Sequence, residues 1–448
     1  MSSKRTVAGK LAEFGGNSLS RRDFLRLGGA GLAGTMLLGA SACGGGESQG
    51  NVILDYWEGI PEETQYKLVK KFNKQNKGEF QITIREMPSD YGEYFDKLKT
   101  EFQAGGGEAD IIAGDTVWTA EFAANGWIAD VSERFPESER NRFIDGAIRS
   151  LTYEGKVYGV PHTLDAGILY YRKDLLEESG FSEAPTTWEE LKEMARKVVR
   201  DQGTRYGFVF QGADYEGGVC NGLEFIWTHG GEVLDPDDAS KVIVDSPESV
   251  EALTTERSMV SDGVSPQTVA SYDESATDTT FVLHGDAVFC RNWPYMYTLG
   301  ANPNSKVKTE QIGVSPLPVG DEQRKSASCL GGDVMLISAS SELKEEAWES
   351  VQFFNSESNQ KSWALEMGEL PTRKALFDDR EVLEALPMIT QAKEALLNVR
   401  PRPVSGHYSE MSGAMALQFN DVLRGAISPE EAVGTLQSKL QQIIEEGR

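Results

Sequence analysis

The chain has 448 residues, of which 39% are hydrophobic and 25% are charged, and its formal net charge at pH 7 is −26. This length predicts two or three domains, and the composition is typical of a soluble globular protein rather than a disordered one. The negative charge argues against binding to nucleic acid or to an anionic membrane through a basic face. The four cysteines and four histidines are widely scattered, so a disulfide-stapled scaffold is excluded and no metal site is expected.

Residues 1–42 have the features of an export signal. Arg21 and Arg22 lie in the sequence SRRDFLR, directly before a short apolar run, which is typical of the twin-arginine signature. Small residues then lead to Cys43, as in a bacterial lipobox, which predicts cleavage before Cys43 and lipidation of that cysteine. The alternative is a cleaved signal peptide with an unmodified Cys43. The Gly-rich residues 43–50 are expected to be a flexible tether.

Strand and helix patterns alternate from residue 52 onward. Strands are expected at 52–57 and, from its period-two alternation, at 81–85. A helix over 91–103 ends at three glycines, and a short buried strand follows at 110–113. With a further helix around 66–72, this order predicts a parallel sheet covered by helices.

A similar pattern restarts after Pro161. Capping boxes predict that helices begin at Thr187 and at Ser428. Further strands are expected at 167–171, 207–210, 287–290 and 334–337. Because no long linker separates the two halves, two α/β units with short crossings are expected, with a ligand bound at their junction.

Several enzyme motifs are missing from the sequence. It contains no phosphate-binding loop and no GxSxG nucleophile elbow. A glycosidase needs only two suitably separated carboxylates, but nothing marks one pair above the others. An enzyme is therefore not expected, and an exported glycan-processing enzyme is kept as the remote alternative.

The order and spacing of several motifs resemble family 1 extracellular solute-binding proteins of ABC importers, from about Val52 to Ile444. The most diagnostic block is GKVYGVP at 155–161 followed by LYYRKDL at 169–175. Within the family, RNWPY at 291–295 is most similar to disaccharide binders of the trehalose/maltose type. Other matching motifs are YWEG at 56–59, ANGWIADV at 124–131, TTWEEL at 186–191 and LPTR at 370–373.

This resemblance implies an α/β, two-lobed periplasmic-binding-protein fold of type II. Each lobe would be a mostly parallel sheet flanked by helices, with the ligand cleft between the lobes. The expected division is 51–163 with 318–372 in the first lobe, and 164–317 with 373–448 in the second. The crossings between lobes are expected near 161–165, 316–320 and 370–375.

The resemblance also implies the function. The expected protein is a monomer, anchored to the outer face of the cytoplasmic membrane by its lipid. It would capture a di- or oligosaccharide by lobe closure and deliver it to the transmembrane permease subunits of an ABC importer, without a cofactor. A glycerophosphodiester or a polyamine remains open as the ligand.

Sugars present hydroxyl groups and apolar faces, which proteins bind with carboxylates, Arg and flat aromatic rings. Glu58 and Asp115 follow strands, where a parallel sheet places its loops at the cleft, and Asp165 lies at an expected crossing. The alternatives are a solvated loop carboxylate for Glu58 and a cap or hinge hydrogen bond for Asp165. Trp293 and Tyr295 flank Pro294 on a loop-like segment, so stacking on a sugar is favoured over core packing.

Two further segments supply candidates. Gly332 could bring backbone N–H groups close to hydroxyls, or form a tight turn between lobes. At Asp333 the chain departs from the family, which often has an aromatic or apolar residue there. Arg402 and Tyr408 lie in a Pro-rich segment that related proteins use to close the cleft, and a surface loop is the equal alternative. At most one disulfide can form among Cys220, Cys290 and Cys329, and three buried thiols are the expectation.

Overall fold

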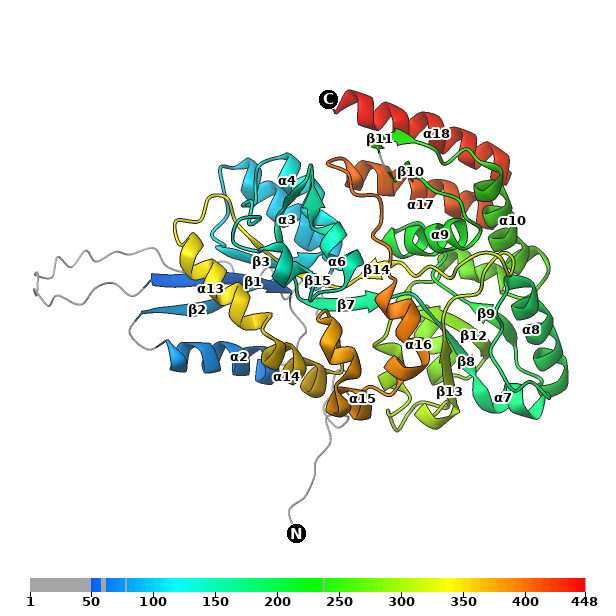
Figure 1. Ribbon diagram of the computed structural model, residues 1–448. Helices are drawn as coiled ribbons and strands as arrows, with labels where there is room; N and C mark the ends of the chain where they lie inside the picture. The colour runs from blue at the N-terminus through cyan, green and yellow to red at the C-terminus, as the bar shows by residue number, and fades with distance from the viewer. Residues whose placement is uncertain (1–49, 58–61, 77–78, 237, 448) are drawn as a thin grey trace, which may run out of the picture.

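The computed structural model describes residues 50–57, 62–76, 79–236 and 238–447. It has two lobes joined by strands that cross between them (Figure 1). The predictions on the export signal, on Cys43 and on Glu58 lie outside the described residues.

The first lobe is built on a five-stranded sheet of order β2-β1-β3-β15-β6. β1 pairs in parallel with β2 and β3, whereas β15 runs antiparallel to β3 and β6. The strands are β1 Gly50–Trp57, β2 Phe80–Met87, β3 Ile111–Asp115, β6 Gly159–Pro161 and β15 Asp333–Ile337. The helices are α2 Glu62–Gln75, α3 Tyr91–Gln103, α4 Trp118–Ala124, α5 Glu137–Arg140, α6 Asp145–Ser150, α13 Lys344–Phe354 and α14 Glu357–Met367, with a short hairpin of β4 Thr152–Tyr153 and β5 Lys156–Val157.

The second lobe is built on a four-stranded sheet of order β13-β8-β12-β9. β8 runs antiparallel to β12 and β13, and β9 runs parallel to β12, so the expectation of a mostly parallel sheet is wrong for this lobe. Its strands are β8 Ile168–Arg172, β9 Tyr206–Val209, β12 Ala287–Asn292 and β13 Ile312–Ser315, with an outer hairpin of β10 Leu234–Asp235 and β11 Asp238–Val242. The larger helices are α8 Trp188–Gln202, α9 Glu216–Thr228, α10 Pro247–Ser261, α17 Tyr408–Arg424 and α18 Pro429–Glu446. The smaller ones are α7 Lys173–Glu178, α11 Glu274–Asp278, α12 Met296–Leu299, α15 Arg380–Ala385 and α16 Met388–Leu397, with single turns at Gln267–Ser271, Thr279–Leu283, Thr309–Gln311 and Lys374–Asp378.

Local sequence signals fix the ends of several helices. The predicted capping boxes at Thr187 and Ser428 are both present, and they begin α8 and α18. α8 ends at Gly203, whose φ of 72° is the left-handed conformation that glycine adopts readily. α8 packs its apolar face onto β9 and β12, whereas α18 packs onto α17 and α10. Both helices belong to the same core cluster of the second lobe, and a separate cluster covers the other face of the sheet.

A small three-stranded antiparallel sheet carries the crossings between lobes. It consists of β14 Leu330–Gly331, β7 Thr163–Ala166 and β16 Leu370–Pro371. The first and third strands of this sheet in the chain lie where crossings were expected, but the second lies at 330–331 rather than 316–320. Val319 instead pairs with Thr187 and stays in the second lobe. Within 318–329, a segment expected in the first lobe, Ala327 and Cys329 pack into the core of the second.

Two general properties concern the cysteines and the helices of the described chain. Cys220, Cys290 and Cys329 are buried and form no disulfide. None of the helices in the described part of the chain is both long and apolar enough to cross a lipid bilayer.

Candidate functional site

A cavity of about 710 Å³ lies between the two lobes, at the small sheet that joins them. Its volume is within the range of about 300–1,000 Å³ that is common for ligand sites. The first lobe contributes Trp57, Tyr91, Asp115 and Asp333, the second contributes Glu216, Glu274, Trp293, Tyr295 and Arg402, and the crossing segments contribute Asp165, Gly331, Gly332 and Glu369.

The structure brings most of the predicted site residues together at this cavity. Its walls include the predicted residues Asp115, Asp165, Trp293, Tyr295, Gly332, Asp333 and Arg402. Tyr408 lies behind the wall, where it is buried and donates a hydrogen bond to Glu216. Glu58, although outside the described residues, directly follows the wall residue Trp57.

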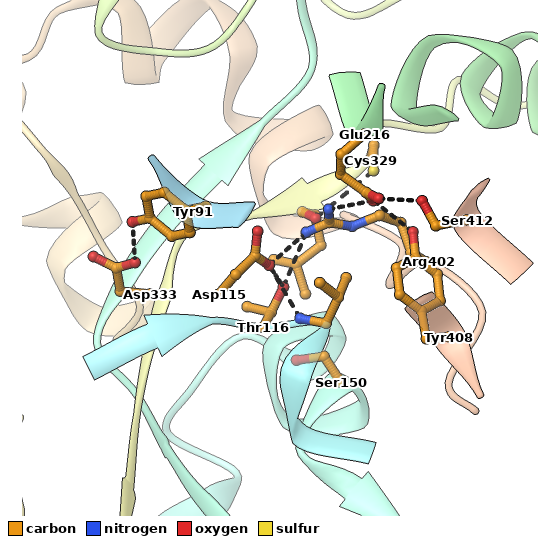
Figure 2. Close-up of polar contacts among 12 residues, drawn as sticks. Tyr91, Asp115, Thr116, Ser150, Glu216, Cys329, Asp333, Arg402, Tyr408 and Ser412 are labelled. Atoms are coloured by element: carbon orange, nitrogen blue, oxygen red, sulfur yellow. Dashed lines mark hydrogen bonds and ion pairs between the residues drawn. The ribbon is translucent and has the colours of Figure 1, made fainter. Parts of the chain in front are cut away.

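Arg402 links the two lobes across one side of the cavity (Figure 2). Its Nη2 donates to Asp115 Oδ1 at 2.8 Å and its Nη1 donates to Glu216 Oε1 at 2.7 Å. Asp115 ends β3 of the first lobe, while Glu216 begins α9 of the second. The Ser412 hydroxyl also donates to Glu216, which holds that carboxylate in place. The Nε of Arg402 is buried, and no described group accepts its hydrogen.

Asp333 holds two aromatic residues at the opposite side of the cavity. Its carboxylate accepts from Tyr91 Oη at 2.6 Å and from Trp57 Nε1 at 3.1 Å. Burial raises the pKa of Asp333 to about 6, although these two donors lower it. Gly332 before it has a φ of +99°, and a Cβ there would lie 2.4 Å from the carbonyl oxygen of Thr163, so only glycine fits this turn.

Asp165 and Glu369 lie at the base of the cavity as partly buried carboxyl groups. No hydrogen bond from a described residue reaches either side chain. Burial, and then the neighbouring Asp333 and Asp115, raise the pKa of Asp165 to about 7. Burial, followed by repulsion from Asp165 and Asp333, raises the pKa of Glu369 to about 8. The two groups therefore have unused acceptor capacity that faces the cavity.

Trp293 and Tyr295 form the aromatic wall on the second lobe. The Trp293 Nε1 donates to Glu274 Oε1 at 3.1 Å, and the Tyr295 hydroxyl donates to Asp278 Oδ2 at 2.8 Å. Trp293 is half-buried and Tyr295 is 39% exposed. Both rings are thus fixed at one edge by a hydrogen bond and still have a face available at the cavity.

Sequence reasoning missed Tyr91, Glu216, Glu274 and Glu369. Three of them are the first residues of helices at the cavity: Tyr91 begins α3, Glu216 begins α9 and Glu274 begins α11. For Tyr91, the capping residue Asp90 was a signal that could have indicated this position. Glu369 follows the helix-ending Gly368 and has no comparable signal.

The chemistry of the cavity suits a ligand with many hydrogen-bond donors. Its carboxylates accept strong hydrogen bonds and its rings cover apolar faces. Among the residues that the structure describes, no group of three or more His, Cys, Asp or Glu side chains is arranged to hold a metal ion.

Comparison with known proteins identifies a family and several similar proteins. Residues 58–361 match the family described as bacterial extracellular solute-binding protein. A probable ABC transporter-binding protein of Deinococcus radiodurans is 30% identical over 370 residues, which cover 81% of this chain and 86% of the relative. The arabinooligosaccharide-binding protein of Bacillus subtilis is 23% identical, over 78% of this chain and 80% of the relative. Maltose-bound MalE3 of T. maritima superposes with a TM-score of 0.77 at 35% identity, covering 88% of this chain and 99% of that one.

Proposed function

The chain belongs to the bacterial extracellular solute-binding proteins, and from this premise we propose that it captures a di- or oligosaccharide of the trehalose/maltose kind. Members of this family bind solutes for ABC transporters and are not enzymes. The observation that carries the proposal is the cavity between the lobes, which combines the aromatic residues Trp57, Trp293 and Tyr295 with several carboxylates.

Sugar binding explains each part of this cavity. A pyranose ring can stack on the face of Trp293, and its hydroxyl groups can donate to Asp165 and Glu369, which have no other donor among the described residues. Asp115, Asp333 and Arg402 then complete the polar contacts. The relatives named for maltose and arabinooligosaccharide support the same ligand class.

The remaining parts of the proposal concern export, lipid anchoring and delivery of the sugar. The twin-arginine sequence at Arg21 and Arg22 and the lipobox at Cys43 support an exported protein that is anchored by lipid to the outer face of the cytoplasmic membrane. In this proposal the monomeric protein closes its lobes on the sugar and delivers it to the permease subunits of an ABC importer. It needs no cofactor for this task.

The proposal is tested with residues 44–448 and a panel of trehalose, maltose, sucrose, maltotriose, glycerophosphocholine and spermidine. A ligand at a hundredfold excess over its Kd should add about 2.7 kcal/mol of stability, which a thermal shift detects. Stabilisation by at least one sugar is expected. No shift with any sugar at millimolar concentration would contradict the proposed ligand class.

Replacement of Trp293 tests the site itself. Trp293→Ala should weaken binding of that sugar by about thirtyfold, or about 2 kcal/mol, because it removes the stacking face. Titration calorimetry measures this loss. The control is Trp127→Ala, since Trp127 is also half-buried but lies away from the cavity. An unchanged affinity in Trp293→Ala would show that the sugar binds elsewhere.

A polyamine is the second candidate because Asp165 and Glu369 are carboxyl groups without donors from the described residues, close to a third carboxylate on Asp333. Protonated amines would pair with these groups. Spermidine in the same panel separates the two candidates, since a shift with spermidine alone would replace the sugar in this proposal.

A further inference from the structure

A fully buried ion pair lies behind the aromatic wall of the cavity. Arg291 on β12 and Glu224 on α9 are 1% and 2% exposed, and they form two hydrogen bonds, from Nη2 at 2.6 Å and from Nε at 2.7 Å. The Arg291 Nη1 also donates to Gln211 Oε1 at 3.2 Å. Burying two charges is costly, and apolar residues of similar volume often stabilise a fold as well or better. Stability alone therefore does not explain why this pair is present.

One side of the pair contacts Trp293. The Arg291 guanidinium lies 4.0 Å from the centre of the Trp293 ring, within cation–π distance. The Nε1 of the same ring donates to Glu274, and the ring lines the cavity. The indole is thus held by a cation at its face and by a carboxylate at its edge.

The other side of the pair contacts the segments that cross between lobes. Glu224 Oε1 accepts the backbone N–H of Cys329 at 2.9 Å, directly before β14. A Cβ at Gly167, directly after β7, would lie 1.7 Å from Glu224 Oε1. The backbone at Gly167 therefore packs directly against the Glu224 carboxylate. A Cβ at Gly331 would lie 3.2 Å from the Trp293 ring. One ion pair therefore contacts the segments next to two of the three crossing strands, β7 and β14, and also the stacking residue.

We propose that Arg291 and Glu224 are positioning residues, which hold the Trp293 indole in its stacking orientation and join it to the crossing strands. Neither residue lines the cavity, so neither touches the ligand directly, and the contact with the cavity wall runs through Trp293. The charge of Arg291 also lowers the pKa of Asp165. The pair then sets ligand affinity more than it sets stability. This inference rests on the proposed function, because it assigns a cause to the orientation of the proposed stacking residue.

The test is the double variant Arg291→Met/Glu224→Gln. Methionine fills the space of the arginine stem, and glutamine keeps an acceptor for the Cys329 N–H, so no buried charge is left unpaired. We expect the melting temperature to stay within a few degrees of the parent and the affinity for the sugar to fall about tenfold. The near-UV circular dichroism of the indole should change, and this change should vanish when both proteins also carry Trp293→Phe.

The control is the pair of Asp55 and Arg85 in the first lobe, in which Arg85 also donates to Glu101 at 2.7 Å. Its two hydrogen bonds are both 2.6 Å long, and neither residue lines the cavity. Asp55→Asn/Arg85→Met should leave the affinity within about twofold, whatever it does to the melting temperature. This control separates a specific effect on Trp293 from the general loss of an ion pair.

The outcomes distinguish the two proposals. If the double variant binds sugar as tightly as the parent while Trp293→Ala does not, the positioning role is wrong and the proposed function stands. If Trp293→Ala also binds normally, the proposed site fails first. Should the double variant not fold, Arg291→Lys decides the question, because lysine keeps the charge but loses the planar, two-pronged contact. A parental affinity in Arg291→Lys, with an unchanged indole signal, would overturn the inference.

Discussion

Glu256 on α10 has a side chain that is 2% exposed, and its Oε2 has no hydrogen-bond partner in the described part of the chain. Burial raises the pKa of this carboxyl to about 8. In the folded protein it keeps its proton below a pH of about 8, whereas in the unfolded chain it ionises above a pH of about 4. The folded state therefore favours the protonated form of Glu256. As the pH increases from about 4 to 8, the free energy of unfolding falls, because the unfolded chain gains stability by ionising this group.

Glu256→Gln should remove this dependence on pH. In this pH range the parent loses about 1.4 kcal/mol of its free energy of unfolding for each pH unit, and the variant does not. The variant should therefore melt several degrees above the parent at pH 8 and close to it at pH 4.5. Scanning calorimetry at both pH values measures the difference. The control is Glu251→Gln, since Glu251 is exposed on the same helix. Equal melting temperatures of Glu256→Gln and the parent at pH 8 would contradict this account.

The raised pKa of Asp165 leads to a prediction about ligand binding rather than about folding. With a pKa of about 7 it is partly protonated near neutral pH, and sugar hydroxyl groups bind the ionised form better. Binding should therefore release protons, and the affinity should rise between pH 5.5 and 8. Calorimetry in phosphate and in Tris, which differ in ionisation enthalpy, reports the release directly. Asp165→Asn should bind more weakly and release fewer protons, and an affinity independent of pH in the parent would rule this role out.

At the scale of single elements, helix α17 depends on a side chain from the other lobe. Glu121 on α4 of the first lobe accepts the backbone N–H of Ser409 at 3.3 Å and also its hydroxyl. Within the described structure, His407, which precedes α17, supplies no side-chain cap of its own. A carboxylate at a helix N-terminus satisfies free N–H groups and the helix dipole. Glu121 therefore favours the arrangement in which α4 and α17 are together.

Glu121→Ala should weaken sugar binding by about threefold to tenfold although it does not line the cavity. The loss corresponds to about 1 kcal/mol of capping energy that is available only when the lobes are close. Calorimetry gives the affinity, and small-angle scattering gives the fraction of extended molecules without ligand. Glu410→Ala, on the exposed first turn of the same helix, should change neither measurement.

The elements themselves followed largely from the sequence, because their signals are local. Thr187 and Ser428 mark helix starts, and the alternation at 81–85 indicates a half-buried strand, which is β2. The crossing at 330–331 could not be found this way, since β14 has only two residues and depends on pairing with β7. The same limit applies to the cavity. Asp115 ends a recognisable strand and Trp293 follows another, whereas Glu369 and Glu216 line the cavity only because distant segments meet.

For the whole molecule, the dominant property is its net charge of −26. Like charges repel in the compact state, and salt shortens the range of this repulsion from about 10 Å at 0.1 M to about 3 Å at 1 M. The melting temperature should therefore rise by several degrees between these salt concentrations. Sodium and potassium chloride should act equally, and a rise with only one of them would indicate a bound cation instead of screening.

The buried thiols have a practical consequence. A hydrogen bond with Cys329, followed by burial, raises the pKa of Cys220, and burial raises the pKa of Cys290. Since only a thiolate attacks a maleimide, these two thiols should not react while the protein is folded. Thr298 is exposed at the edge of the cavity. In a chain that begins after Cys43, Thr298→Cys would give dyes a single reactive position beside the ligand. The same burial that packs the second lobe thus makes the protein suitable as an optical sensor for whatever solute it carries.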